Sequence, residues 1–531
     1  MKFPSFCETS PVRVLVVLVL LLQSAIIGRA QDSIVCPSCS QTMPGKFHFC
    51  GNCGTSLDGV AHMDGPMPAA APATAPKKDS LISFYGHPLE FGGKPEHKPG
   101  SALSDKVLPL APETPRPPPL LEIGQNPFLG SGTISPGFTL PTGAVWQPVF
   151  LLYGTARSAF QVFDNGIQQN TEWVSRLDLF GNLYLTPTER ILVGIRPLDR
   201  KGEYTGYRYF PNPDTLDAFN GNIRTLFFEG DFGELFPNLD PDDRYSLDYG
   251  FAVGRQPLSF QNGIMISDDA VDAVGITRSS LFVLGASAVR TTALFAWNEL
   301  NGNNNAPENS SAKLFGLFIA ADYPKTTLDL DVAYVNDRKN DGLYVGFGAT
   351  QRIFGLINST FRVNSSFALA DESEAVSNGT LLFGQLSTTL PHGKDIAYVN
   401  AFWGIDNYAS ADRGPDAGGP LGQTGILFAA QGLGNYGAPL GNRANSAIGA
   451  ALGFQKFIGG TDRQLVLEVG SRTNTRTPQF FAQSESTSIA AAARYQMKLN
   501  AHSVFIADVF VAFPEERDTS YGIRVELLLK F

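Results

Sequence analysis

The chain has 531 residues and a formal net charge of −10, and 17% of its residues are charged while 11% are aromatic. This acidic balance argues against nucleic acid as a partner, because phosphate contacts need a basic face. Residues 146–531 hold 30 Lys and Arg against 40 Asp and Glu and contain no cysteine, which suits a long domain that folds in an oxidising compartment.

The first 30 residues have the organisation of a secretory signal peptide. Lys2 and Arg13 form a positive region, residues 14–27 form an apolar region, and the sequence GRA at 28–30 is a small-residue cleavage signal. An uncleaved anchor is the alternative, but the apolar run is short for a membrane span, which needs about 20 residues. We therefore expect residues 1–30 to be removed.

Two Cys-x-x-Cys pairs follow in the stretch CPSCSQTMPGKFHFCGNCG, residues 36–54. Each pair can place two thiolates about 2.3 Å from one metal ion, and two pairs complete a tetrahedron. The pattern resembles the short zinc-ribbon family over residues 34–58, which implies a structural Zn²⁺ ion. The implied ligands are Cys36, Cys39, Cys50 and Cys53. Two disulfides, with three alternative pairings, are the competing interpretation.

A proline-rich segment separates these cysteines from the rest of the chain. Residues 66–119 contain 13 prolines in 54 residues, and such a composition favours an extended polyproline spacer. We expect residues 59–145 to be a periplasmic linker. The ribbon at its end is then expected to lie in the periplasm and to hold a periplasmic protein or a cell-wall partner.

From residue 146 to residue 531, apolar and polar residues alternate with a period of two in stretches of about ten residues. In TLDLDVAY, for example, Leu328 and Leu330 lie opposite Asp329 and Asp331. A soluble β-sandwich also alternates, but here tight turns at 186–189, 459–462 and 499–502 are interspersed with long loops at 298–312 and 404–447. That asymmetry predicts an all-β fold, a transmembrane antiparallel barrel of about 16 to 18 strands.

The C-terminal sequence YGIRVELLLKF supports the same fold. Tyr521, Val525 and Phe531 belong to one strictly apolar face, while Arg524 and Glu526 lie on the other. This ending resembles the closing strand of bacterial outer-membrane proteins. The last strand should pair with the first, near residues 149–163, because an open edge in lipid leaves backbone groups unsatisfied.

A barrel of this size encloses a lumen wide enough for solutes. We therefore expect an outer-membrane porin for passive diffusion of small hydrophilic solutes or ions, surrounded by lipid and assembled as a homotrimer. The charged residues that alternation assigns to the lumen are mixed in sign, which orients polar solutes more than it selects one ion. They include Arg176, Asp178, Arg190, Arg196, Asp329, Asp331, Glu468, Arg494, Lys498, Asp508, Arg524 and Glu526.

The segment 250–278, GFAVGRQPLSFQNGIMISDDAVDAVGITR, contains a more specific pattern. Its Gly-Arg-Gln, followed by a loop and an Asp-rich strand, resembles a segment of the alginate-export and phosphate-selective porin families. The resemblance implies an inward loop with Arg255 projecting into the lumen. It implies further that Asp268, Asp269 and Asp272 form an acidic cluster beside that arginine. Capping of a loop at the rim is the alternative role for these carboxylates.

An enzyme is not expected. A barrel phospholipase needs a Ser and His pair, and residues 146–531 contain only two histidines, His392 and His502. His502 is next to Ser503, but this pair lies at a tight turn, on the wrong side for attack on outer-leaflet lipid. The alternative to a pore is a structural or adhesive barrel that anchors the ribbon.

Overall fold

The computed structural model describes residues 33–35, 42–44, 118–124 and 136–531, apart from 243–245, 284, 304–308, 338–339, 392, 430–431 and 478–485. The signal peptide, the four ribbon cysteines and most of the proline-rich linker lie outside the described residues. Two units are distinguished, residues 1–109 and 110–531. In the first, β1 (Ser33–Val35) and β2 (Thr42–Pro44) form an antiparallel pair.

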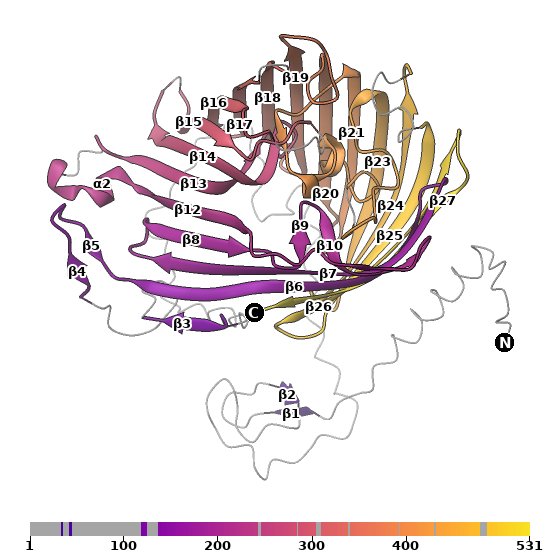
Figure 1. Cartoon of the computed structure of the whole chain (residues 1–531), viewed down its shortest axis with the longest axis horizontal. Coiled ribbons are helices and arrows are strands. Elements are labelled where there is room, and N and C mark those ends of the chain that lie inside the picture. Colours follow the sequence, from indigo (N-terminus) through magenta and orange to yellow (C-terminus); the bar gives the residue numbers. More distant parts are fainter. Residues whose placement is uncertain are drawn as a thin grey trace, which may run out of the picture. The chain divides into compact units, whose positions relative to one another are not determined.

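The second unit is a closed antiparallel barrel with eighteen strand positions in its wall, in which each strand pairs with the next along the chain (Figure 1). The wall strands are β6 (Val149–Asp164), β7 (Gln169–Tyr184), β8 (Arg190–Ile195) with β10 (Glu203–Phe210), β11 (Asp214–Leu216) with β12 (Ile223–Asp231), β13 (Tyr249–Phe260), β14 (Ile266–Leu281), β15 (Ala288–Asn298), β16 (Lys313–Tyr323), β17 (Thr326–Asn336), β18 (Gly342–Ile353), β19 (Ile357–Ala368), β20 (Gly379–Thr389), β21 (Ile396–Asn407), β23 (Asn445–Ile458), β24 (Arg463–Asn474), β25 (Ser488–Lys498), β26 (Ser503–Pro514) and β27 (Ser520–Lys530). The expected all-β barrel is confirmed, with the strand number at the upper end of the prediction.

Two wall positions are interrupted. Strands β8 and β10 pair with successive parts of β7, and the chain between them leaves the wall through β9 (Asp199–Arg200). The next position is divided in the same way, since β11 pairs with β10 and β12 pairs with β8. The excursion at 196–202 carries charged side chains into the lumen.

The barrel closes where the sequence predicts. Strand β27 pairs with β6 from Tyr521 opposite Asp164 to Lys530 opposite Thr155. Strand β6 is longer than β27, and β3 (Leu121–Ile123) pairs with the part of β6 that β27 leaves uncovered. The segment expected to be linker, residues 59–145, is therefore not a spacer throughout. It contributes β3 and a hairpin of β4 (Phe138–Thr139) and β5 (Val145–Trp146).

The two faces of the wall differ as the alternation requires. On β17, Leu330 and Val332 are exposed on the outside, whereas Asp331 and Ala333 are buried on the inside. The same contrast separates Leu467 from its neighbour Glu468 on β24. An outer face rich in exposed aliphatic and aromatic side chains is the surface that a lipid-facing barrel presents. No helix in the described part of the chain is both long enough and apolar enough to cross a membrane.

The two ends of the barrel carry different connections. At the end that holds the C-terminus, the connections are six residues or fewer, with one exception. The exception is the 17-residue connection 232–248, which contains α2 (Phe232–Leu235) and η1 (Pro237–Leu239). We call this the short-turn end. The opposite, long-loop end carries the connections 299–312, 408–444 and 475–487.

The connection 408–444, hereafter the inward loop, folds back inside the barrel. It contains η2 (Pro415–Ala417), η3 (Pro420–Gln423) and β22 (Asp412–Arg413), which pairs in parallel with the start of β14. Leu421, Phe428 and other apolar side chains of the inward loop pack in one buried cluster with lumen-facing residues of the wall. The wall makes room with small residues, which are Ala447, Ala451, Ala490, Ala492 and Ala512.

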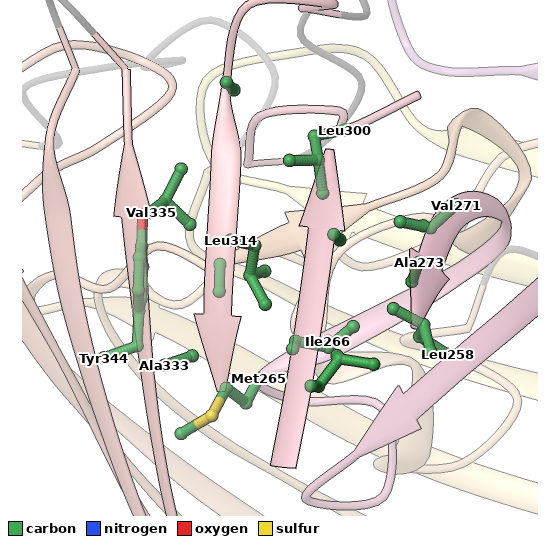
Figure 2. Packing of buried hydrophobic residues seen from close by; sticks show 14 of the residues in the cluster. Leu258, Met265, Ile266, Val271, Ala273, Leu300, Leu314, Ala333, Val335 and Tyr344 are labelled. Carbon is green, nitrogen blue, oxygen red and sulfur yellow. The ribbon is translucent and has the colours of Figure 1, made fainter. Parts of the chain in front are cut away.

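A second buried cluster lies beside the first and is built around the β13–β14 turn (Figure 2). Met265 of this turn and Ile266 at the start of β14 pack with Leu314 on β16 and Tyr344 on β18, and Ala409 of the inward loop also belongs to the cluster. The sequence predicts a loop within 250–278 that enters the lumen. In the structure that loop is only the short β13–β14 turn, between Phe260 and Ile266. Most of the chain inside the barrel comes from 408–444.

Replacing Leu330 with arginine tests the orientation of the wall. Leu330 is 48% exposed on the outer face of β17, and burying a charge in the middle of the hydrocarbon lowers the free energy of unfolding by about 2–4 kcal/mol. Urea unfolding from lipid vesicles measures this loss. Leu369→Arg is the control, since Leu369 is 57% exposed in a connection at the long-loop end. Equal losses for the two variants would contradict the assignment.

Candidate functional site

A belt of ion pairs runs around the inside of the barrel, starting on β25. Arg494 bonds to Asp508 on β26 at 2.6 Å, and Asp508 also pairs with Arg524 on β27. Arg524 reaches Glu526 at 3.2 Å, and Glu526 accepts from Arg157 on β6 at 2.6 Å. Each carboxylate in this row is therefore shared between two guanidinium groups.

The belt continues past the barrel seam on β7. Arg176 lies directly across from Arg157 in the register and pairs with Asp178 at 3.0 Å. Arg196, from the excursion after β8, bonds to Asp178 at 2.6 Å and also to Asp269 on β14. The excursion thus places the guanidinium of Arg196 inside the barrel, where it links Asp178 on β7 with Asp269 on β14.

On the wall formed by β17 and β19, charged side chains contact the β13–β14 turn. Arg362 on β19 pairs with Asp329 at 3.2 Å and donates to Gln261 in the turn at 2.7 Å. The amide of Gln261 in turn donates to Asp331 at 2.8 Å. These contacts fix the β13–β14 turn against the inside of β17 and β19.

The inward loop is attached to the inside of the barrel at three separated points, the first of which is in the belt. Asp416 pairs with Arg196 at 3.1 Å, and the backbone N–H of Leu427 donates to Glu468 at 2.7 Å. Further along, the backbone N–H of Asn435 donates to Glu172 on β7 at 2.6 Å. Because charge-assisted hydrogen bonds are the strong ones, these contacts hold the loop across the lumen.

The start of the inward loop holds two buried carboxylates. Asp412 accepts from the backbone N–H of Asn301 at 2.8 Å, and Asp268 on β14 accepts from the side-chain amide of Asn301 at 2.8 Å. Burial raises the pKa of Asp412 well above its usual value, and the charge of Asp268 acts in the same direction. Asn301 thus donates to both carboxylates, one through its backbone and one through its side chain.

A polar pocket of about 280 Å³ remains between the wall and the inward loop. Its walls come from β7, β10 and β11, and the inward loop closes one side with Gly434 and Asn435. The charged side chains that line it are Glu172, Glu203, Arg208 and Asp217. The space that the inward loop leaves here is therefore lined by charged and polar groups.

Seven of the nine pore residues predicted from sequence lie on the lumen side and take part in the contacts above. They are Arg176, Asp178, Asp268, Asp269, Asp329, Asp331 and Arg494. They do not form one cluster, because Asp329 and Asp331 face the β13–β14 turn across the barrel from Arg176. Asp268 and Asp269 also separate, the first toward Asp412 and the second toward Arg196.

The prediction that Arg255 projects into the lumen beside Asp272 differs from the structure. Arg255 is paired in the register with Leu226 and lies two residues from Val253, and both of these are exposed on the outer face. Asp272 lies opposite Arg255, and the two side chains bond at 2.8 Å. The pair therefore sits on the outer face, because the strand period places residues 254 and 256, not 255, toward the interior.

Several interior residues are not among those predicted from the sequence. Arg157 and Arg362 lie on predicted strands, and the alternation of their neighbours could have placed them in the lumen. Asp412, Arg413 and Asp416 lie in the inward loop, which has no periodic pattern. No local signal in the sequence indicates which wall residues these loop residues would meet.

No protein-family model matches the chain, and no curated protein matches it. Among solved structures, it is similar to a BenF-like porin from Pseudomonas fluorescens, with 10% identity and a TM-score of 0.49 over 72% of this chain and 99% of that one. The outer membrane protein OpdK from Pseudomonas aeruginosa shows 10% identity and a TM-score of 0.46, covering 72% of this chain and 98% of its own. Wzi from Escherichia coli, described as a carbohydrate-binding β-barrel involved in Group 1 capsule assembly, shows 9% identity and a TM-score of 0.44 over 71% and 84% of the two chains.

Removing Arg524 tests whether the belt is a coupled network. Arg524→Ala leaves the buried carboxylates of Asp508 and Glu526 without one of their partners, and breaking a buried pair in this way costs about 3–5 kcal/mol of unfolding free energy. The control is Arg476→Ala, because Arg476 pairs with Asp406 at 3.0 Å but is 77% exposed, so its loss should cost about 0–1 kcal/mol. A similar, small loss for both variants in urea unfolding would show that the belt adds little.

Proposed function

We propose that the chain is an outer-membrane channel through which small hydrophilic solutes or ions diffuse passively. The observation that carries this proposal is the charged belt on the inside of an eighteen-strand wall whose outer face is apolar. Barrels with about eight strands fill their interior with side chains, whereas barrels of 16 to 18 strands enclose an aqueous lumen.

The inward loop narrows that lumen and divides it into two kinds of surface. Its apolar side chains pack against the alanine-rich wall of β23, β25 and β26, so that part of the cross-section is filled. We place the solute path on the other side, along Arg157, Arg176 and Arg196 and the carboxylates paired with them. A lining of paired charges orients a polar solute and discriminates weakly between cations and anions.

A structural barrel that anchors the ribbon is the second candidate. The observation that favours it is the apolar packing of the inward loop, which resembles a folded core more than a mobile constriction. In this alternative the loop closes the barrel, and the chain serves to display residues 34–58 in the periplasm.

Shortening the inward loop distinguishes the two functions. Residues 414–441 would be replaced by a short Gly/Ser linker, which keeps the pairing of β21 with β23 intact. For a channel, the wild-type protein gives ohmic steps in planar bilayers, and the variant gives steps roughly twice as large or more because the lumen widens. Single-channel recording measures both.

The matched control shortens a different long-loop connection, residues 475–487, which should leave the step size unchanged. A silent wild type beside a conducting 414–441 variant would support the anchoring function and overturn the channel. A folded 414–441 variant whose steps equal those of the wild type would show that the inward loop does not limit the lumen.

For the N-terminal region we propose that Cys36, Cys39, Cys50 and Cys53 hold one structural Zn²⁺ ion after export. A segment of this length has no core of its own, so the metal would supply its folding energy. The exported protein should contain one zinc ion per chain by elemental analysis, with four thiols that react only after chelation. Zinc-free protein in which all four cysteines resist thiol reagents until reduction would show disulfides instead.

A further inference from the structure

The 17-residue connection between β12 and β13 stands out at the short-turn end, where the other connections have six residues or fewer. It begins with α2, whose N-cap residue Asp231 accepts from the backbone N–H of Gly233 at 2.8 Å. Phe232 packs on Phe251, with ring centroids 4.6 Å apart, on the outer face of the wall.

The faces of β13 and β14 establish where this contact lies. Phe251 pairs with Ile276 in the register and lies two residues from Val253, and both Ile276 and Val253 are exposed on the outside. Phe228 of β12 packs edge-on against the same Phe251 ring. The connection therefore leans outward, onto the surface that faces lipid.

An apolar groove of about 460 Å³ lies between the connection and the wall. Its lining residues are Phe232, Phe236, Leu239, Leu247, Tyr249 and Ile276. Leu239 is 72% exposed, although it lies at the edge of an apolar groove. The groove is continuous with the exposed outer face at Tyr249 and Ile276, so an occupant from the surrounding lipid reaches it without crossing a polar surface.

Charged groups of both signs lie close to the groove. The guanidinium of Arg278 stacks over the ring of Tyr249 at 4.8 Å and donates to the backbone oxygen of Asp248 at 2.7 Å. By sequence the connection is acidic, with five carboxyl groups and one guanidinium, which are Glu234, Asp240, Asp242, Asp243, Asp248 and Arg244. An ammonium group suits this acidic segment, and a phosphate group suits the guanidinium of Arg278.

We propose that this groove binds one acyl chain of a zwitterionic phospholipid, with its phosphate toward Arg278 and its ammonium group toward the acidic connection. The site lies at the end of the barrel that holds the C-terminus, and it does not depend on whether the lumen conducts. An anionic phospholipid has the same acyl chains but no positive group, so the carboxylates of the connection repel its headgroup.

Native mass spectrometry of the full-length protein tests this site, with phosphatidylethanolamine and phosphatidylglycerol of equal chain length added to the detergent-purified barrel. The wild type should retain phosphatidylethanolamine in preference to phosphatidylglycerol. Two variants remove the groove in different ways: Leu239→Ser together with Leu247→Ser makes its wall polar, and Leu247→Trp fills it. Each variant should weaken lipid retention about tenfold, because the acyl chain of the lipid loses its apolar contact with one or two leucine side chains.

Phe354→Ser is the matched control, since Phe354 is 80% exposed in the β18–β19 turn, at the same end but outside the groove. It should retain the lipid as the wild type does. Unchanged retention in both groove variants, with folding verified by gel mobility, would overturn the site. Equal retention of the two phospholipids by the wild type would overturn the assigned headgroup.

Discussion

The constraint on which this structure depends is that backbone N–H and C=O groups facing lipid must find partners within the protein, because each one left unpaired costs several kcal/mol. The pairing of β27 with β6 meets this constraint at the only seam between distant parts of the chain in the described wall. Strand β3 meets the same constraint, since it pairs with the part of β6 that β27 does not cover. A segment that reads as linker by composition is thereby drawn into the barrel.

Closure turns every second side chain inward, and the inside must then satisfy its own polar groups. The belt does so by sharing: Asp508, Glu526 and Asp178 each contact two arginines. Buried ion pairs add little net stability against apolar residues of the same volume, but breaking one is costly. The belt is therefore better understood as a means of fixing positions, and through Arg196 and Asp416 it helps to fix the inward loop, which Glu468 and Glu172 hold at two further points.

The wall was predictable from sequence to a greater extent than its contents. A period of two assigns a face to each residue on a regular strand, so Asp331, Glu468 and Arg524 were placed correctly. Arg255 shows the limit of a motif, because the resemblance pointed inward while the period of its own strand, marked by the exposed Val253, points outward. Where the motif and the strand period disagree, the period prevails, because it follows from backbone geometry.

The interior resisted prediction for a different reason. Residues 408–444 are rich in glycine and lack periodicity, and their partners on β7, β14 and β24 are far away in the sequence. One indirect signal was present: four lumen-facing positions of β23 and β25, which are 447, 451, 490 and 492, are alanines, although a lumen in contact with water favours polar residues. Small apolar residues on the inner face indicate that something packs there. The same reasoning applies on the outside, where the apolar groove beside α2 indicates an occupant that the lipid around the barrel supplies.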